Sequence, residues 1–221
     1  MILLIFDLGF HKGDDTYFYL SKGHRVIAVE ANPELVIKGR KRFKHMLKFV
    51  LINKAISYDN DIIKFYIHPI HSDWSSCDKS YAERDGIPSK EVSVESTSLI
   101  KLCEEYGVPH YLKVDIEGRE LFVAEQLNEL KHKPEYVSFE TGRTNYLQIL
   151  LMLYNAGYRK FQLRNQLNNS KYSSGSFGIY LPNDKWLDYQ EVLYRYRKYV
   201  ELKNIDSEEL GLGWLDVHAG L

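Results

Sequence analysis

Residues 1–16 read MILLIFDLGFHKGDDT, and the fold of the chain can be argued outward from them. The run Ile2–Leu8 is apolar on both of its faces, which is typical of a central strand covered by helices on either side. Gly9 and Gly13 follow, and glycine lets a backbone turn sharply and approach a ligand without a Cβ in the way. Helical spacing then extends over Asp15–Lys22. A strand, a glycine turn and a helix in this order predict the first unit of a parallel sheet with a ligand site at the turn.

The rest of the chain alternates between short β-branched or aromatic runs and stretches with helical spacing. The further strands expected are Arg25–Glu30, Lys48–Asn53, Tyr111–Asp115, Tyr136–Glu140, Tyr158–Leu163 and Ser176–Leu181. The further helices expected are Pro33–Met46, Arg119–Leu130, Thr144–Asn155 and Trp186–Leu202. This alternation predicts an α/β fold: a doubly wound, Rossmann-like, mostly parallel seven-stranded sheet with helices on both faces. Since no helix separates the last two strands, we expect an antiparallel strand at one edge.

Two long polar loops interrupt this pattern. Residues 62–68 alternate like a strand, and a Ser-rich loop that contains Trp74 follows them over about 69–90. A second polar loop spans 164–176. Loops of this length in a compact domain are more often functional lids than neutral insertions. Because no repeat or linker rich in proline or glycine divides the chain, residues 1–221 are expected to form a single domain with two lid-like insertions.

Composition and charge narrow the class of protein. Hydrophobic residues make up 44% and charged residues 27% of the chain, a globular balance, and the formal net charge is −1. A near-neutral chain has no global field to attract a polyanion, so nucleic acid is disfavoured as a partner. The two cysteines are too few for a disulfide framework. The apolar start has no basic flank and meets Asp7 early, so it is expected to be a buried strand of a soluble, cytoplasmic protein with no membrane partner. A homo-oligomer stays open.

Two acids stand where a cofactor would bind in such a sheet. The spacing from Asp7 is D-x-G-x-x-x-G, not the G-x-G-x-x-G of dinucleotide enzymes, which disfavours an NAD-linked dehydrogenase. A carboxylate at Asp7 would repel a pyrophosphate but could accept from an ammonium group. Glu30 closes the second strand, where it could accept from both hydroxyls of a ribose. The alternatives are an acid near a helix start for Asp7 and a surface residue for Glu30.

The chain resembles the FkbM-type methyltransferases of the class I S-adenosylmethionine-dependent superfamily. The matching stretches are DLGFHKGDDTYFYLSKGHRVIAVEANPEL from Asp7, NKAIS from Asn53, HYLKVDIEGRELFV from His110 and YVSFE from Tyr136. SSGSFG and the terminal GWLDVHA look like elements of some members. The resemblance implies the doubly wound fold and S-adenosylmethionine as cofactor, and it extends in order over nearly the whole chain.

The resemblance also implies roles for single positions. Asp7, Gly9 and Gly13 would line the methionine moiety, Glu30 the ribose, Asn53 to Ala55 the adenine, and Asp115 the region of the methyl group or the methionine amine. The full set expected to bind the cofactor is Asp7, Gly9, Gly13, Thr16, Glu30, Asn32, Asn53, Ala55 and Asp115. Gly9→Val is expected to abolish binding and leave the fold largely intact. No metal site is expected.

Methyl transfer is an in-line displacement that needs an aligned nucleophile and often a base. The catalytic candidates are Asp115, Glu140 and His218, and the substrate-binding candidates are His71, Trp74 and Glu117. Each has a structural alternative. Glu117 could cap the helix that follows it, an interpretation we rank slightly ahead of a functional one, and Glu140 could pair with Arg143. His71 could be an exposed loop residue, and His218 could belong to a terminal segment docked through Trp214.

These features predict a methyltransferase whose acceptor is a hydroxyl on a small molecule, such as a sugar or a glycosylated or secondary metabolite. The acceptor rests on family analogy and on the absence of a polyanion-binding field. Methylation of RNA or protein is the alternative, supported by a basic run over residues 38–48. The third interpretation is that the protein is a non-catalytic relative, which keeps the fold and serves as a binding subunit. The sequence does not identify the acceptor, the atom methylated, a base or the pathway.

Overall fold

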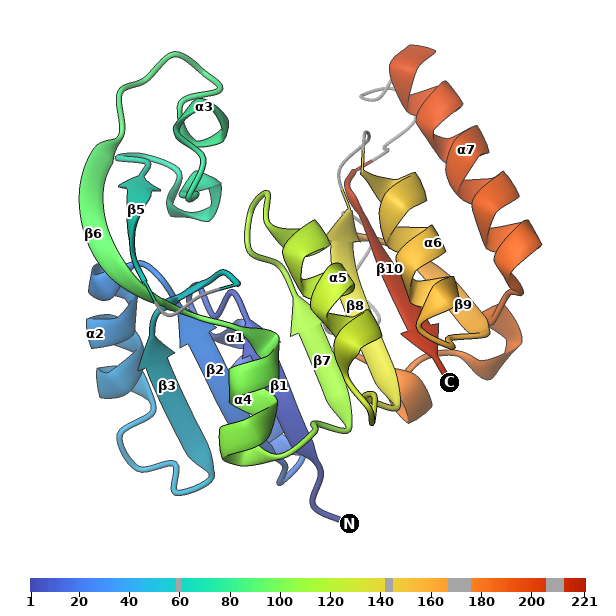
Figure 1. Ribbon diagram of the computed structural model, residues 1–221, viewed down its shortest axis with the longest axis horizontal. Coiled ribbons are helices and arrows are strands. Elements are labelled where there is room, and N and C mark those ends of the chain that lie inside the picture. The colour runs from blue at the N-terminus through green and yellow to red at the C-terminus, as the bar shows by residue number, and fades with distance from the viewer. Residues whose placement is uncertain (59–60, 142–144, 167–175, 206–212) are drawn as a thin grey trace.

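The computed structural model describes residues 1–58, 61–141, 145–166, 176–205 and 213–221 (Figure 1). The strands are β1 (Leu4–Leu8), β2 (Arg25–Glu30), β3 (Phe49–Asn53), β4 (Ala55–Ile56), β5 (Ile62–Ile67), β6 (Lys90–Thr97), β7 (Tyr111–Val114), β8 (Tyr136–Thr141), β9 (Lys160–Asn165) and β10 (Leu215–Gly220). The helices are α1 (Asp14–Ser21), α2 (Pro33–Arg42), α3 (Lys79–Ala82), α4 (Leu99–Tyr106), α5 (Glu120–Glu129), α6 (Tyr146–Asn155) and α7 (Tyr189–Ile205).

Seven strands form the central sheet, in the order β3-β2-β1-β7-β8-β10-β9. Neighbours from β3 to β8 pair in parallel, and β10 pairs antiparallel with both β8 and β9. The predicted fold class is therefore confirmed: a doubly wound, mostly parallel seven-stranded α/β sheet with antiparallel pairing at one edge. The chain reverses its direction of winding between β1 and β7, and the carboxyl ends of strands at such a switch point are where α/β sheets bind ligands.

The strand expected at Ser176–Leu181 is wrong. This segment contains a 3-10 helix, Gly178–Tyr180, and the antiparallel strand of the sheet is β10 at the end of the chain. The apolar character of the segment comes from packing on the sheet instead of pairing within it. The ring of Phe177 stacks on that of Tyr111 with centroids 4.1 Å apart. Burial alone therefore produced a strand-like sequence signal.

The middle of the chain holds elements that the sequence analysis did not assign. Strand β6 pairs antiparallel with β5 and parallel with β4 in a separate three-stranded sheet, and α4 follows it. The loop at 69–90 contains a 3-10 helix, Ser72–Trp74, and α3. Figure 1 shows β5, β6 and α3 on the side where the parallel strands end. The second proposed insertion, 164–176, lies mostly outside the described residues.

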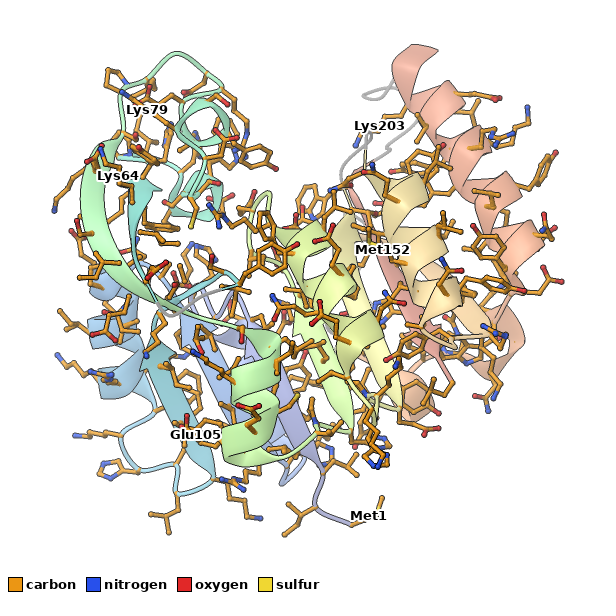
Figure 2. All side chains as sticks on the ribbon, viewed as in Figure 1. Met1, Lys64, Lys79, Glu105, Met152 and Lys203 are labelled. Carbon is orange, nitrogen blue, oxygen red and sulfur yellow. The ribbon has the colours of Figure 1, made fainter. Side chains whose placement is uncertain are left out.

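Helices cover both faces of the central sheet, and side chains fill the space between the layers (Figure 2). Buried residues of α4, α5, α6 and α7 pack with one face in the larger core cluster. Residues of α1 and α2, together with Phe177, pack against the other face. The core holds the strand ends in register, so the loops that follow them meet at one edge. Within the described part of the chain, no helix has the length and apolar character needed to cross a bilayer.

Candidate functional site

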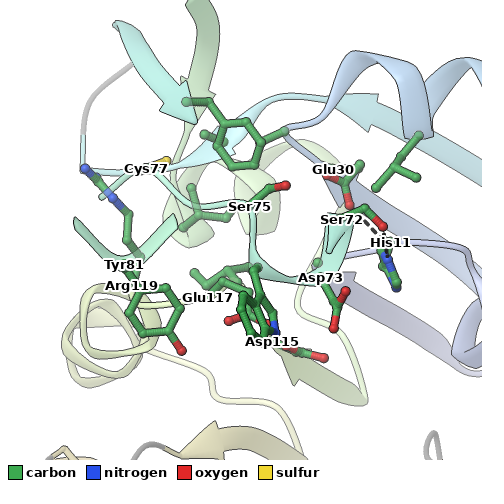
Figure 3. Close-up of a pocket in the computed structure, with 18 of the residues that line it drawn as sticks. His11, Glu30, Ser72, Asp73, Ser75, Cys77, Tyr81, Asp115, Glu117 and Arg119 are labelled. Carbon is green, nitrogen blue, oxygen red and sulfur yellow. Dashed lines mark hydrogen bonds between the residues drawn. The ribbon is translucent and has the colours of Figure 1, made fainter. Parts of the chain in front are cut away.

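A cavity of about 450 Å³ opens at the carboxyl edge of the sheet (Figure 3). The ends of β1, β2, β7 and β8 contribute Gly9, Glu30, Asp115 and Glu140, and β4 contributes Ala55. The other wall comes from the insertion at 69–90. The cavity thus lies at the switch point of the sheet, where the fold predicts a ligand.

Position 9 requires glycine for a structural reason that the sequence analysis missed. Its φ is +90°, and a Cβ there would lie 1.6 Å from the carbonyl oxygen of Asp115. The glycine therefore allows the ends of β1 and β7 to approach each other, and a side chain would collide with backbone. The expectation that Gly9→Val leaves the fold largely intact is wrong, because the clash lies between two central strands.

Glu30 is a buried carboxylate held by backbone donors. The amide of His11 donates to its Oε2 at 2.8 Å and the amide of Asn32 to its Oε1 at 2.7 Å. Burial outweighs these bonds and raises the pKa of Glu30 to about 7. His11 has a φ of 50°, which is uncommon for a residue with a side chain and costs backbone energy. The loop is thus shaped to fix this carboxylate, which keeps free lone pairs for a ligand.

Lys113 is the centre of a buried ion cluster. Its Nζ lies 3.4 Å from a carboxylate oxygen of Asp7, 3.4 Å from one of Asp15 and 3.3 Å from one of Asp115. Burial opposes the charge of Lys113, but the carboxylates outweigh it and hold its pKa well above the ordinary value. Burial raises the pKa of Asp7 to about 6. Burial is the largest single influence on Asp115 and raises its pKa, but the charge of Lys113 and the hydrogen bonds from Glu140 and Lys113 together lower it, so Asp115 stays ionised.

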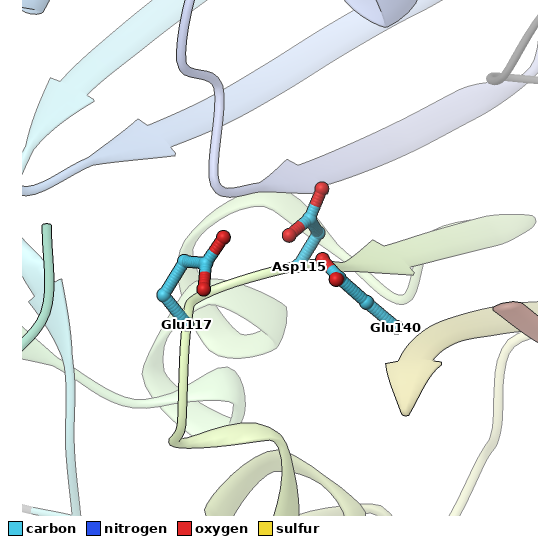
Figure 4. Close-up of side chains that lie close together, drawn as sticks. All are labelled: Asp115, Glu117 and Glu140. Carbon is cyan, nitrogen blue, oxygen red and sulfur yellow. The ribbon is translucent and has the colours of Figure 1, made fainter. Parts of the chain in front are cut away.

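Three carboxyl groups meet where β7 and β8 end. Oxygens of Asp115, Glu117 and Glu140 lie within 4.8 Å of one another (Figure 4). Burial and the charge of Asp115 raise the pKa of Glu117 to about 8 and that of Glu140 well above its ordinary value. Glu140 therefore holds a proton and donates it to Asp115 in a hydrogen bond. At neutral pH the group combines one ionised carboxylate with two carboxyls that favour the protonated form.

A model of the FkbM methyltransferase domain matches residues 7–160, which is most of the chain. The chain belongs to the FkbM methyltransferase family. It is accordingly an S-adenosylmethionine-dependent methyltransferase, and the predicted family and cofactor are confirmed. No curated protein sequence matches it.

Solved structures of other methyltransferases resemble this one at low sequence identity. Precorrin-6y C5,15-methyltransferase from Geobacter metallireducens is 10% identical, with 98% of this chain and 78% of that chain covered and a TM-score of 0.42. Aeropyrum pernix fibrillarin with S-adenosylmethionine bound is 10% identical, with 98% and 66% covered and a TM-score of 0.46. Burkholderia thailandensis 1,6-didemethyltoxoflavin-N1-methyltransferase is 9% identical, with 99% and 71% covered and a TM-score of 0.45.

Several residues expected to bind the cofactor do not line the cavity but make contacts within the surrounding structure. Asp7 is buried and accepts a hydrogen bond from Thr16 at 2.7 Å. Asn32 caps α2 by accepting from the amide of Glu34 at 3.0 Å. The side-chain amide of Asn53 donates to the backbone carbonyls of residues 30 and 31. A Cβ at Gly13 would meet the rings of Phe10 and Phe43, so this glycine serves packing.

The insertion joins both ends of the site. The ring of His11 hydrogen-bonds the hydroxyl of Ser72 at 2.9 Å (Figure 3). The hydroxyl of Ser76 donates to the carbonyl of Glu117 at 2.6 Å. The guanidinium of Arg84 lies 4.2 Å from the ring centroid of Trp74, which lines the cavity. His71 is exposed and stacks on Trp74, outside the cavity wall.

No side chain of the described residues caps the start of α5, so the capping role considered for Glu117 is wrong. The carboxylate of Glu120 accepts from the amides of Ile116 and Gly118, while Glu117 lines the cavity with a φ of 53°. The pairing considered between Glu140 and Arg143 lies outside the described residues.

His218 stands apart from the cavity. It is buried in β10, opposite Ser138 and Gln162, and burial lowers its pKa to about 3. The geometry gives it no contact with the other catalytic candidates, and its catalytic role stays a prediction.

The sequence analysis also missed three residues of the site. Lys113 could have been found as a lysine within the otherwise apolar run Tyr111–Val114. Tyr81 and Arg84, which line the cavity from the insertion, carry no local signal, because their place depends on how the loop folds back.

Proposed function

We propose that this methyltransferase transfers a methyl group to a hydroxyl of a neutral small molecule, such as a sugar or a glycosylated or secondary metabolite. The observation that supports it most is the placement of Glu117. This carboxyl has a pKa of about 8 and lines both the main cavity and an adjoining cavity of about 230 Å³. A base with a pKa near the working pH at such a junction suits removal of a hydroxyl proton.

The residues at the β1–β2 end fit S-adenosylmethionine, whose sulfonium supplies an electrophilic methyl group. Glu30 would accept from the ribose hydroxyls, because its two backbone donors leave lone pairs unused. The apolar side chains of Leu35 and Ile56, which line the same cavity, would flank the adenine. Asp115, kept ionised by Lys113, would attract the ammonium of the methionine end.

The carboxyl cluster would then orient the acceptor. Asp115 and the protonated Glu140 would hold the acceptor hydroxyl, and Glu117 in its ionised form would take the proton. Proximity and alignment supply most of what a methyl transfer needs. Three oxygens within 4.8 Å of one another also suit a divalent cation, so the experiment below includes a chelator to detect a metal requirement.

The charge of the site favours a neutral acceptor over RNA. The carboxylate of Asp115, which stays ionised, would repel a phosphate group. Most of the basic residues of the 38–48 run lie in the last turn of α2 and beyond it. In a parallel unit that end of the helix is opposite the carboxyl edge that carries the cavity. The small-molecule partner, a homo-oligomer and a cytoplasmic location remain predictions from the sequence.

The proposal can be tested by incubating the protein with methyl-labelled S-adenosylmethionine and one of four separate acceptor pools. These pools are hydroxylated sugars and glycosides, amines, RNA, and protein. We expect the label in an alkali-stable ether of a hydroxyl compound, with no effect of a chelator. Label in RNA with steep salt dependence would contradict it and support the alternative. Binding of S-adenosylhomocysteine without transfer to any pool would favour the non-catalytic reading.

A further inference from the structure

A second cavity of about 230 Å³ adjoins the main one on the side of β8 and β10. Four residues line both cavities: Tyr81, Glu117, Glu140 and Trp214. The carboxyls of the cluster therefore lie at the junction. A molecule in the second cavity would meet them from the side opposite Glu30.

Most polar groups of its wall are already bonded. The hydroxyls of Thr141 and Tyr196 lie 2.6 Å apart, and Thr141 also donates to the carbonyl of Leu215 at 2.9 Å. The hydroxyl of Tyr199 donates to the carbonyl of Gly213 at 2.8 Å. These bonds fix the wall and leave those hydroxyls little capacity for a ligand.

Asn145 is different. It lines the second cavity at the start of α6, yet its side chain makes no capping bond. Its Oδ1 is buried and has no hydrogen-bond partner in the described part of the chain. A buried oxygen without a donor is costly, so a ligand that offers an O–H or N–H would be favoured here.

The mouth shared by the two cavities is aromatic. Trp214 is 50% exposed and Tyr81 is 38% exposed, although both are large rings. The guanidinium of Arg84 lies 4.3 Å from the centroid of the Tyr81 ring, so Trp214 is the more open of the two rings. An exposed flat ring beside a cavity is suited to the C–H face of a cyclic ligand and would bury apolar area on contact. Glu117 and Glu140 beside these rings favour the uncharged, protonated form, so this part of the wall suits an uncharged ligand.

We propose that the second cavity is the acceptor subsite and takes a neutral, ring-shaped polyol of about monosaccharide size. Asn145 Oδ1 accepts from one ligand hydroxyl, and Tyr81 and Trp214 cover the ring while another hydroxyl reaches the carboxyl cluster. This assignment rests on the proposed function and names the residue that would select the acceptor.

The test uses the whole chain saturated with S-adenosylhomocysteine and three probes of one shape. These are methyl α-D-glucopyranoside, its 2-amino-2-deoxy analogue, which is cationic, and its 6-phosphate, which is anionic. Ligand-observed NMR titration should give the tightest binding for the neutral probe. In Asn145→Leu the dissociation constant of that probe should rise about tenfold, the effect of one lost hydrogen bond. Asn145→Asp keeps an accepting oxygen and should recover part of the affinity.

Asn155→Leu, the same exchange at an exposed position near the other end of α6, should change nothing. The affinity for S-adenosylhomocysteine should stay within about twofold in all variants, which shows that the fold and the cofactor end are intact. Three results would each overturn the subsite. The protein could bind the cofactor product but not the neutral probe, it could bind the cationic or anionic probe more tightly, or the dissociation constant of the neutral probe could be unchanged in Asn145→Leu. Failure of the wild type to bind the cofactor product would instead count against the proposed function.

Discussion

The two halves of the carboxyl edge are built in different ways. At the β1–β2 end, the key carboxylate of Glu30 is held by backbone amides of residues close to it in sequence or in the adjoining loop. At the β7–β8 end, Asp115 and Glu117 come from the loop after β7 and Glu140 comes from β8, and oxygens of the three carboxyls lie within 4.8 Å of one another.

This difference affects the charge of each half. Backbone amides are fixed dipoles that stabilise an anion without titrating. Carboxyls that contact one another raise each other's pKa values and share protons. We infer that the first half is shaped to hold one constant ligand, and that the second half is shaped to move a proton.

The largest effect is expected where β1 meets β7. Gly9 and Gly23 both have positive φ, but a Cβ at Gly9 would lie 1.6 Å from backbone whereas a Cβ at Gly23 meets nothing within 4 Å. Gly9→Ala should lose more than about 4 kcal/mol of unfolding free energy or fail to fold, and Gly23→Ala only about 1–2 kcal/mol. Urea denaturation followed by circular dichroism would measure both. Equal losses would show that backbone strain, not the clash, governs Gly9.

Removal of Lys113 should have the next largest effect. Lys113→Met leaves Asp7, Asp15 and Asp115 without their buried cation, which should cost about 3–5 kcal/mol at pH 7.5. The pKa values of Asp7 and Asp115 would then rise in the folded state, so the variant should regain stability as the pH falls toward about 5. Lys64→Met, which removes an exposed pair with Glu91, should leave the stability nearly unchanged at either pH. A loss for Lys113→Met that does not change with pH would contradict the ion-cluster explanation.

Glu30 should control the affinity for the cofactor. Because its pKa is about 7 and the carboxylate form accepts the ribose hydroxyls, binding of S-adenosylhomocysteine should strengthen as the pH rises through 7. Glu30→Gln should weaken binding about 10–100-fold at pH 8 and remove this dependence.

Calorimetric titration between pH 5.5 and 8.5 would measure this. Exposed Glu34→Gln serves as the matched control. A dependence that remains near pH 6 in Glu30→Gln would report Asp7, whose pKa is about 6. A wild type whose affinity does not change with pH would count against the ribose assignment.

Glu117 should give the smallest effect, and one of opposite sign. Its pKa is about 8 in the folded protein against an ordinary 4.5, so its contribution costs stability increasingly as the pH rises from 4.5 to 8. Glu117→Gln should stabilise the cofactor-free protein by about 1–3 kcal/mol at pH 8.5 and hardly at all at pH 4.5, while it lowers methyl transfer. Thermal melts at the two pH values would measure it, with exposed Glu125→Gln as control. Destabilisation at pH 8.5 would mean that Glu117 is a structural anchor.

The first half of the sheet was predictable because its signals are local. Apolar Leu4–Leu8, the glycines after it and Glu30 at the end of β2 lie within one βαβ unit, and the capping of α2 by Asn32 is a contact between near neighbours. The sequence by itself therefore determined the fold class, the family and the edge of the sheet at which the main cavity lies. It did not show why position 9 requires glycine, because the atom that excludes a side chain there belongs to Asp115, which is distant in sequence.

The second half was decided by tertiary structure. Strand β10 follows α7 in the chain but enters the sheet between β8 and β9. The segment around Phe177 has the sequence of a strand, yet Phe177 packs on the face of the sheet against Tyr111. Whether Glu117 caps a helix or lines a cavity depends on burial and on its neighbours Asp115 and Glu140, which no local pattern specifies. Secondary structure follows from local periodicity, but the charge state of a buried carboxyl follows from every group around it, and only the folded chain brings those groups together.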